Sequence, residues 1–336
     1  MDERPPGDEP TLAAALRRRA ADTPHEVFIV AEAVAGDVRS VTFAGLAARA
    51  GRLARLLRSM GIGHGSRFHV HLPNCAEFAE CLFAGAELGA VMVPTSPDST
   101  PDDLAYVLSH SAATVSVTEP ALLPGVLEAR DLAPELGEVL LARSGRSLAG
   151  SRLLEEALAG ESEEPPRVRA RPGDTAVILY TSGTTGWPKG VEVSHASLLF
   201  AGEVVAQALR MRPDDRWLVA LPLFHGNALY YSTMSALVTG ASLVLAESFE
   251  PGRWAEQVVR HRPTLASLFA TQVRMVLAQP VTGAESDAGL RATVYAQNLG
   301  GETLPAVGDA VRLTWRPEHT FVVKPSAPLA DWEEEA

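Results

Sequence analysis

The sequence predicts an α/β fold in which mostly parallel sheets are flanked by helices. Short runs of β-branched and aliphatic residues alternate with longer segments whose apolar residues recur at helical spacing. The apolar share of 46% in 336 residues is enough for a large hydrophobic core. A chain of this length can form two ordinary domains, or one large α/β domain with a small appendage.

The alternation of strands and helices is clearest in the first third of the chain. Thr42 can cap a helix whose apolar residues fall on one face, and Gly61 marks the end of that helix. A strand over 68–72, a helix over 76–88 and a strand over 91–94 are expected to follow. This βαβ order predicts a parallel sheet covered by helices.

The first of these helices also carries arginines at a spacing of three residues, namely Arg49, Arg52, Arg55 and Arg58. Polar residues at this spacing line the side of an amphipathic helix that faces away from the core. We therefore interpret the arginines as a solvent-exposed face rather than as a phosphate-binding patch.

The chain is less regular from residue 97 to residue 175, where residues 160–173 form a polar connector broken by prolines. Beyond this connector the alternation resumes. Strands are expected at 176–180, 217–221, 242–245, 265–269 and 292–297. Helices are expected from about residue 195 and over 228–238, 251–261 and 271–278.

Charge and cysteine content limit the class of protein. The formal net charge of -12 argues against nucleic acid as the main partner. We expect no membrane span, because no run of about 18 uncharged apolar residues is present, and the acidic N-terminus does not resemble a signal peptide. Cys75 and Cys81 are the only cysteines, and we expect them to be core thiols of a cytoplasmic protein.

A loop rich in glycine and hydroxyl side chains follows the strand expected at 176–180, where residues 180–190 have the sequence YTSGTTGWPKG. Glycine lets backbone N–H groups approach a ligand, and consecutive N–H groups form a concave site for phosphate oxygens. Lys189 adds a compact positive charge, and Pro188 fixes the backbone beside it. The predicted phosphate-binding residues are Thr181, Ser182, Gly183, Thr184, Thr185, Gly186 and Lys189.

A turn that binds no ligand is the alternative interpretation of this loop. We disfavour it because many demanding residue types coincide directly after a buried strand. The spacing also differs from that of the P-loop NTPases, in which the lysine follows a glycine and precedes Ser or Thr. Here Pro188 precedes the lysine and Gly190 follows it, so a kinase or ATPase of that type is not expected.

The longer stretch YTSGTTGWPKGVEVSH resembles the phosphate-loop signature of the adenylate-forming (acyl-activating) enzymes. That superfamily contains acyl-CoA synthetases, the adenylation domains of peptide synthetases and the luciferases. Three further stretches are similar to segments of the same family: VTFAGLAARAGRLARLLRSMGIGHGSRFHVHLPNCAEF, LPLFHGNALYYS and RATVYAQNL. The residues of the phosphate loop and of YAQNL lean toward the carnitine/crotonobetaine-CoA ligase branch.

This resemblance implies an activity in two steps. A carboxylic acid attacks the α-phosphorus of Mg-ATP to give an acyl-adenylate and pyrophosphate, and a thiol such as CoA then displaces AMP. The implied cofactors are ATP, Mg²⁺ and CoA, and the implied partner is a small-molecule carboxylic acid. The implied catalytic residues are Lys189 and His225, and His225 would border the acyl pocket.

Other histidines are expected to be structural, and a structural role is also the alternative for His225. His195 would open the helix that follows the phosphate loop, and His69 and His71 alternate on a short strand. No metal ligand is identified. The family resemblance also implies candidates for the adenine or acyl pocket, namely Gln297, Asn298, Gly300, Gly301 and Glu302.

The resemblance stops near residue 300. Members of the family carry a Mg²⁺-binding Glu motif, a ribose-binding Asp and a small C-terminal lid domain with a catalytic lysine, and residues 300–336 match none of these. The stretch GDAVRLTWRPEHTFVV is instead similar to the accessory β-barrel of ABC-transporter ATPase subunits. We therefore expect an incomplete large N-terminal domain of the adenylate-forming fold over 1–299 and an unrelated tail over 300–336, with the lid domain absent.

Two functions remain open at this point. The chain is either an acid–thiol ligase with an incomplete catalytic set or a truncated, non-catalytic remnant that at most binds nucleotide phosphates. A third interpretation, an accessory protein of an ABC transporter, depends on the tail alone. An incomplete domain would also leave apolar faces uncovered, which predicts self-association.

Overall fold

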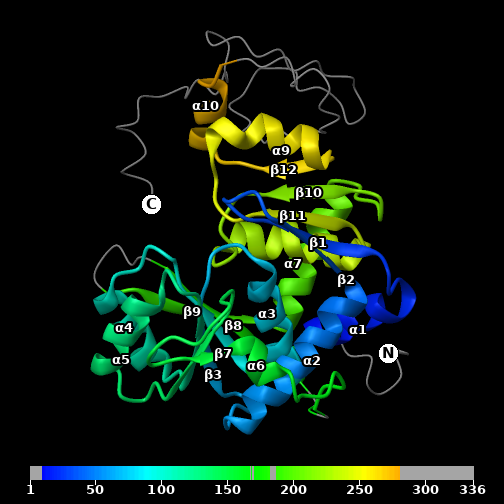
Figure 1. Ribbon diagram of the computed structural model, residues 1–336. Helices are drawn as coiled ribbons and strands as arrows, with labels where there is room; N and C mark the ends of the chain where they lie inside the picture. The colour runs from blue at the N-terminus through cyan, green and yellow to red at the C-terminus, as the bar shows by residue number, and fades with distance from the viewer. Residues whose placement is uncertain (1–9, 167, 169, 182–186, 281–336) are drawn as a thin grey trace, which may run out of the picture. The chain divides into compact units, whose positions relative to one another are not determined.

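The computed structural model describes residues 10–166, 168, 170–181 and 187–280. The chain forms two compact units. The first consists of Met1–Phe249 with Pro263–Ser267, and the second of Glu250–Arg262 with Leu268–Ala336. The sheets and most of the helices belong to the first unit (Figure 1).

The larger sheet has seven strands in the order β7-β6-β5-β3-β4-β8-β9. All neighbours in it are parallel except β9, which runs antiparallel to β8 at the edge. The strands are β3 (Arg67–His71), β4 (Val91–Pro94), β5 (Val115–Thr118), β6 (Glu138–Leu141), β7 (Arg152–Leu153), β8 (Thr175–Thr181) and β9 (Lys189–Ser194).

The smaller sheet has five strands in the order β12-β10-β11-β1-β2. Here β2 is the antiparallel edge strand, and the other neighbours are parallel. The strands are β1 (Val27–Glu32), β2 (Val38–Thr42), β10 (Arg216–Val219), β11 (Ser242–Ala246) and β12 (Leu265–Ser267).

Helices cover these sheets, as parallel strands require. In the first unit they are α1 (Leu12–Asp22), α2 (Phe43–Ser59), α3 (Ala76–Leu88), α4 (Pro101–Ser111), α5 (Leu123–Leu132), α6 (Leu154–Leu158), α7 (His195–Ala208), the π-helix η1 (Asn227–Met234) and α8 (Ser235–Thr239). The second unit contains the 3₁₀ turn η2 (Pro251–Arg253), α9 (Trp254–His261) and α10 (Ala270–Leu277). Among the described residues, none of these helices is both long and apolar enough to cross a membrane.

Helix α3 is buried at every one of its 13 residues, including three glutamates. A buried carboxylate is tolerated only when it is paired. Glu80 is paired with Arg39 of β2 at 3.0 Å and with Arg49 of α2 at 2.9 Å. Glu87 is paired with Arg17 of α1. Burial raises the pKa of both carboxyl groups, so these ion pairs oppose the cost of placing charge in the core.

One asparagine joins the two sheets directly after β3. The buried Asn74 side chain donates to the carbonyl oxygens of Leu221 at 2.9 Å and Ala246 at 3.1 Å, and it accepts from the Leu223 N–H at 2.8 Å. Leu221 and Leu223 follow β10, and Ala246 ends β11. Asn74 therefore fixes the carboxyl ends of the smaller sheet against the carboxyl end of β3.

The predicted α/β class with mostly parallel, helix-flanked sheets is confirmed. Helix α2 has the expected cap, because the Thr42 hydroxyl accepts from the Gly45 N–H at 3.0 Å, and Gly61 adopts a φ of 87° just after the helix. Helix α3 and strand β4 match their expected ranges. The two cysteines are free and buried, as predicted for core thiols. The strand expected at 292–297 lies outside the described residues.

The prediction that residues 97–175 are less regular is wrong. This segment contains α4, α5 and α6 and strands β5, β6 and β7. Strand β4 has the same length as β5 and β6 and was predicted, so length alone does not explain why β5, β6 and β7 were missed. Helix α4 did carry a signal, because Thr100 and Asp103 form a capping box at its start.

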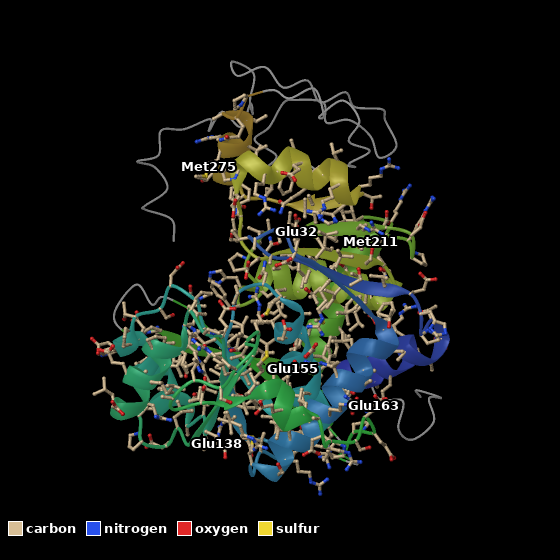
Figure 2. All side chains as sticks on the ribbon, viewed as in Figure 1. Glu32, Glu138, Glu155, Glu163, Met211 and Met275 are labelled. Carbon is tan, nitrogen blue, oxygen red and sulfur yellow. The ribbon has the colours of Figure 1, made fainter. Side chains whose placement is uncertain are left out.

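The arginine face of α2 is not simply exposed to solvent, which corrects that expectation. Arg49 binds Glu155 at 2.7 Å as well as Glu80, and Arg52 binds Glu163 at 2.7 Å. The two glutamates, labelled in Figure 2, come from α6 and from the connector that follows it. Arg55 donates to the connector backbone at the Glu164 carbonyl. The stripe therefore holds the acidic connector against α2.

We expect Asn74→Ala to lower the free energy of unfolding by about 2–4 kcal/mol, since it removes three hydrogen bonds and leaves buried backbone groups without partners. Urea denaturation followed by circular dichroism measures the change. Glu135→Ala, at an exposed position of the same unit, is the control and should change the value by less than about 0.5 kcal/mol. Equal stabilities of the two variants would contradict the role given to Asn74.

Candidate functional site

The predicted phosphate loop joins two strands of a hairpin. Thr181, the last residue of β8, lies opposite Lys189, the first residue of β9. Strand β8 is parallel to β4, so the loop leaves the larger sheet at its carboxyl edge. Ligands of open α/β sheets bind at that edge. Five residues of the predicted set, Ser182, Gly183, Thr184, Thr185 and Gly186, lie outside the described residues.

Lys189 and Thr181 are both exposed at the open end of this hairpin. No salt bridge joins Lys189 to another of the described residues. An exposed ammonium group without a carboxylate partner can bind an anion without first breaking an ion pair. The strand β9 itself was not expected from the sequence, because its first two residues, Lys189 and Gly190, belong to the glycine-rich stretch 180–190.

Four aromatic rings surround the carboxyl-terminal end of the loop, and we call this group the aromatic clamp: Tyr106, His110, Tyr180 and Trp187. The Tyr106 hydroxyl donates to the Pro188 carbonyl at 3.0 Å, and the Tyr106 ring stacks on Trp187 with centroids 4.9 Å apart. A hydrogen bond of 2.7 Å joins His110 Nδ1 to the Tyr180 hydroxyl. Burial raises the pKa of Tyr180 to about 12, so this phenol stays protonated at neutral pH.

His225 lies after β10, immediately before η1. Its backbone N–H donates to the Pro222 carbonyl at 3.1 Å, and its ring centroid is 4.4 Å from that of Phe224. Partial burial lowers the pKa of His225, which keeps the imidazole neutral at pH 7. The loop that carries it is bound by Asn74, so it lies at the carboxyl end of β3 in the larger sheet.

The helix after His225 is a π-helix, a form that is rare and frequent at functional sites. The Thr233 hydroxyl donates to the Ala228 carbonyl at 2.9 Å and so satisfies one acceptor of the widened turn. Asn227 Oδ1 and Ser232 Oγ are buried and have no hydrogen-bond partner among the described residues. A Cβ atom at Gly202 of α7 would lie 2.6 Å from the Met234 backbone, so only glycine permits this approach of α7 to η1.

The structural interpretation of His69, His71 and His195 is confirmed. His69 is bound to Ser116 and Thr95 at 2.9 Å each, and His71 to Thr95 at 2.8 Å. His195 is the first residue of α7 and is buried. Burial lowers the pKa of His71 and of His195 to about 4, and lowers that of His69 further below its usual value.

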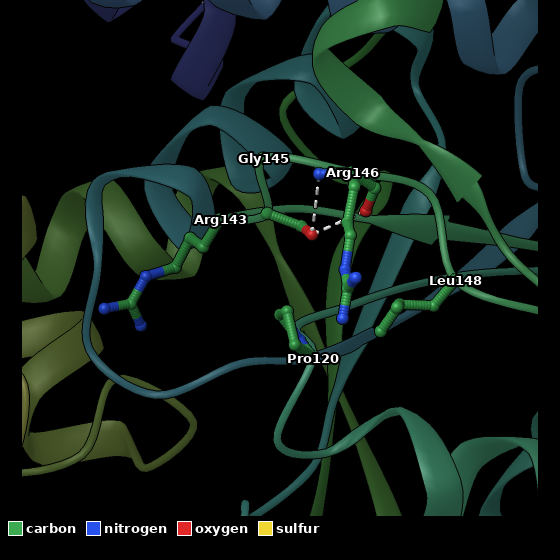
Figure 3. Close-up of a pocket in the computed structure, with 6 residues that line it drawn as sticks. Pro120, Arg143, Gly145, Arg146 and Leu148 are labelled. Carbon is green, nitrogen blue, oxygen red and sulfur yellow. Dashed lines mark hydrogen bonds between the residues drawn. The ribbon is translucent and has the colours of Figure 1, made fainter.

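One open cavity of about 530 Å³ lies away from these residues, between the loops after β5 and β6 (Figure 3). It is lined by Pro120, Arg143, Ser144, Gly145, Arg146 and Leu148, and no residue of the predicted site lines it. The Arg143 guanidinium is held by Glu119 at 2.7 Å and Glu247 at 2.5 Å, which ties the loops after β6, β5 and β11 together. We assign this cavity no part in the candidate site.

The candidates for the adenine or acyl pocket, Gln297, Asn298, Gly300, Gly301 and Glu302, lie outside the described residues. Within the part of the chain that the structure describes, no three His, Cys, Asp or Glu side chains are grouped to hold a metal ion. The described site therefore consists of the two ends of the phosphate hairpin, the aromatic clamp and the His225 loop. Of these, the clamp was not predicted, because Tyr106 and Pro188 are 82 residues apart in the sequence.

Residues 16–314 match the family of AMP-binding enzymes. The chain is 30% identical over 279 residues to a crotonobetaine/carnitine–CoA ligase of Salmonella paratyphi B. This alignment covers 82% of the chain and 54% of the relative, so the chain spans about half the length of the curated relatives it matches.

The fold of this chain is also similar to the folds of solved structures. The inhibitor-bound N-terminal domain of FACL13 from Mycobacterium tuberculosis has a TM-score of 0.76 and 28% identity, covering 84% of this chain and 68% of that one. ATP-bound MatB from Rhodopseudomonas palustris has a TM-score of 0.69 and 28% identity, covering 80% of this chain and 51% of that one.

The buried histidines predict a loss of stability in acid. Each has a folded-state pKa below its unfolded value of about 6.5, so the unfolded chain takes up protons first as the pH falls. The contribution of these histidines to the free energy of unfolding should be constant above pH 6.5. It should decrease as the pH falls from 6.5 to about 4. For His71 alone the loss approaches roughly 3 kcal/mol.

Urea denaturation at pH 7.5, 6.5, 5.5 and 4.5 measures this dependence. The variant His71→Gln keeps a polar side chain that does not titrate in this range. Its stability should fall less steeply with pH than that of the wild type. Parallel curves for the two proteins would show that His71 does not contribute.

Proposed function

The chain belongs to the AMP-binding enzyme family, and from that premise we propose that it activates a carboxylic acid with ATP and transfers the acyl group to a thiol such as CoA. In the first step a carboxylate oxygen attacks the α-phosphorus, and the bond to pyrophosphate breaks. In the second step the thiolate attacks the acyl carbonyl, and AMP leaves. Relatives about twice as long are named CoA ligases, and we propose this activity for the present chain.

The observation that carries the proposal is the hairpin end at the carboxyl edge of the larger sheet. Thr181 and Lys189 face each other there, at the two ends of the glycine- and threonine-rich loop. A positive charge and backbone N–H groups at this place suit the β- and γ-phosphates of ATP. Such groups stabilise the negative charge that moves onto pyrophosphate as it leaves. Lys189 and the predicted residues 181–186 are therefore proposed to bind the phosphates.

Mg²⁺ fits this site without a preformed cage of side chains. The ion usually binds one or two carboxylates and takes its other ligands from water and substrate phosphates. It would neutralise the charge of the phosphates that Lys189 also contacts.

His225 is proposed to border the acyl group. Its neutral imidazole can lie against an apolar acyl chain without the desolvation cost of a charged group. The unpaired Asn227 Oδ1 at the start of η1 is a nearby polar group that a rearrangement on binding could expose. Gln297, Asn298, Gly300 and Gly301 are proposed to complete the adenine or acyl pocket.

We keep the predicted organisation as a proposal, with a partial AMP-binding domain over 1–299 and a distinct tail over 300–336. The two buried free thiols support the proposal of a reducing, cytoplasmic location. Self-association is also proposed, and exposed apolar side chains on α7, Phe200 and Val204, support it.

ATP–pyrophosphate exchange with a panel of carboxylic acids tests the first step. We expect exchange that depends on the acid, and we expect Lys189→Ala to reduce it about 10- to 100-fold, because a charge-assisted contact is lost. Lys324→Ala, at the only other lysine, is the matched control and should leave the rate unchanged. ATP binding without exchange would favour the non-catalytic, nucleotide-binding alternative.

For His225→Ala we expect a larger effect on the acid than on ATP. The KM for the carboxylic acid should rise about 5- to 20-fold, since a ring that borders the acyl group is removed, while the KM for ATP stays within about twofold. Steady-state kinetics with each substrate varied in turn provide the comparison. An equal rise for both substrates would indicate a structural role for His225.

A further inference from the structure

Helix α4 contacts both ends of the phosphate hairpin through the aromatic clamp. Tyr106 reaches the segment just before β9, where it hydrogen-bonds Pro188 and stacks on Trp187. Its ring also meets the edge of Tyr180 near the end of β8, with centroids 6.4 Å apart. His110, one turn later on α4, stacks on Tyr106 at 5.4 Å and bonds to the Tyr180 hydroxyl. One helix face thus holds the entry and the exit of the loop.

These contacts act directly next to Lys189. The Pro188 carbonyl belongs to the peptide unit that includes the Lys189 nitrogen, and that unit is planar. Fixing the carbonyl therefore fixes the plane from which the Lys189 backbone continues into β9. The pair Thr181–Lys189 is the outermost of the hairpin among the described residues, so the clamp acts where the pairing of β8 with β9 ends.

The aromatic clamp is only partly core packing, because Tyr106 and Tyr180 lie against a small buried apolar cluster and Trp187 does not. Trp187 is 68% exposed although its ring is stacked, and Tyr106 is only half-buried. The geometry is instead directional, with a hydrogen bond and a ring stack inclined by 19°. The helix that presents Tyr106 is itself anchored by the Thr100–Asp103 capping box and by its buried leucines. A rigid element that holds a loop through directional contacts is suited to positioning.

We propose that Tyr106 is a positioning residue for phosphate binding, holding the Trp187–Pro188 segment so that Lys189 meets a polyphosphate in one fixed place. His110 supports it by joining the same helix to Tyr180. The inference rests on the proposed phosphate-binding role of Lys189 and adds a residue, on a different helix, that acts through it. Tyr106 does not touch the phosphates.

The test measures binding of magnesium tripolyphosphate to the full chain by isothermal titration calorimetry. Tyr106→Phe keeps the ring and removes the hydrogen bond to Pro188, and we expect its Kd to rise about 2- to 10-fold. Tyr106→Leu removes the stack as well and should raise the Kd further. Ser109→Ala, at an exposed position of α4, is the control and should bind like the wild type. Melting temperatures identify any variant that is simply unfolded.

A double-mutant cycle separates positioning from a general structural effect. If Tyr106 acts through Lys189, Tyr106→Phe should have little further effect in a Lys189→Gln background. Additive losses, or a Tyr106→Phe variant that binds like the wild type, would overturn the proposal and leave the proposed function standing. Failure of the wild type to bind the probe would instead overturn the proposed phosphate site, and the positioning role with it.

Fluorescence of Trp187 reports the clamp itself, without any ligand. The difference between the wild type and Trp187→Phe gives the signal of this one tryptophan. We expect acrylamide to quench it more strongly in Tyr106→Leu than in the wild type, since the stacked ring no longer covers one face of the indole. Unchanged quenching would show that the ring stack does not hold Trp187 in solution, which contradicts the proposal.

Discussion

The burial of helix α3 is the constraint on which the rest of the first unit depends. The helix is covered on every side, and residues from both sheets join it in a single hydrophobic cluster. Its carboxylates can be buried only if cations reach them, and these come from α1, β2 and α2. Pairing therefore fixes where these three elements lie around α3. The apolar core supplies the driving force for the burial of α3. The ion pairs favour one arrangement of α1, β2 and α2 around it.

The same constraint reaches the candidate site through the turn between β3 and α3. Asn74 lies in this turn, so the burial of α3 fixes its place. Its amide holds the backbone on both sides of Pro222, three residues before His225. The loop that carries His225 is thus held by the core of the larger sheet, although it belongs to the smaller one. A loop positioned by a rigid scaffold is the usual arrangement for a site at the carboxyl edge of an α/β sheet.

Arginine and lysine side chains have different roles in this chain. The arginines that face α3 and the acidic connector are held by carboxylates through forked, directional contacts. Arg143 likewise joins two glutamates at the ends of strands. Lys189 is the one lysine among the described residues, and it forms no salt bridge with them. A compact ammonium on a flexible stem suits a polyphosphate, which presents charge without the planar geometry of a carboxylate.

The sequence was informative where a local signal determines the structure. Thr42 and Gly61 bound α2 because capping and positive φ are properties of single residues. The predicted phosphate loop also rests on local residue types, and its binding role stays a prediction. Strands β5 and β6 were missed, because a run of three or four buried residues forms a strand only when neighbouring strands supply hydrogen bonds. Strand β9 was missed because most of its residues are exposed and it shows no buried apolar run, so that its pairing with β8 defines it.

The aromatic clamp shows why a sequence can reveal one part of a site and not another. Trp187 lies between Gly186 and Pro188 in the sequence, and no neighbouring residue indicates which ring it stacks on. Its partner is on α4, whose place depends on how β4 and β5 flank β3 in the sheet. A contact of this kind depends on topology, which local patterns do not encode.

Phosphate binding and acyl transfer place different requirements on a site. Phosphate binding needs a charge and a loop held at one edge, whereas acyl transfer also needs groups that stabilise the transition state of thiolate attack on the acyl carbonyl. The described residues supply the charge of Lys189 and the contacts that hold its strand. Binding of phosphate is therefore the part of the proposed activity to which the described residues of the hairpin are most directly related.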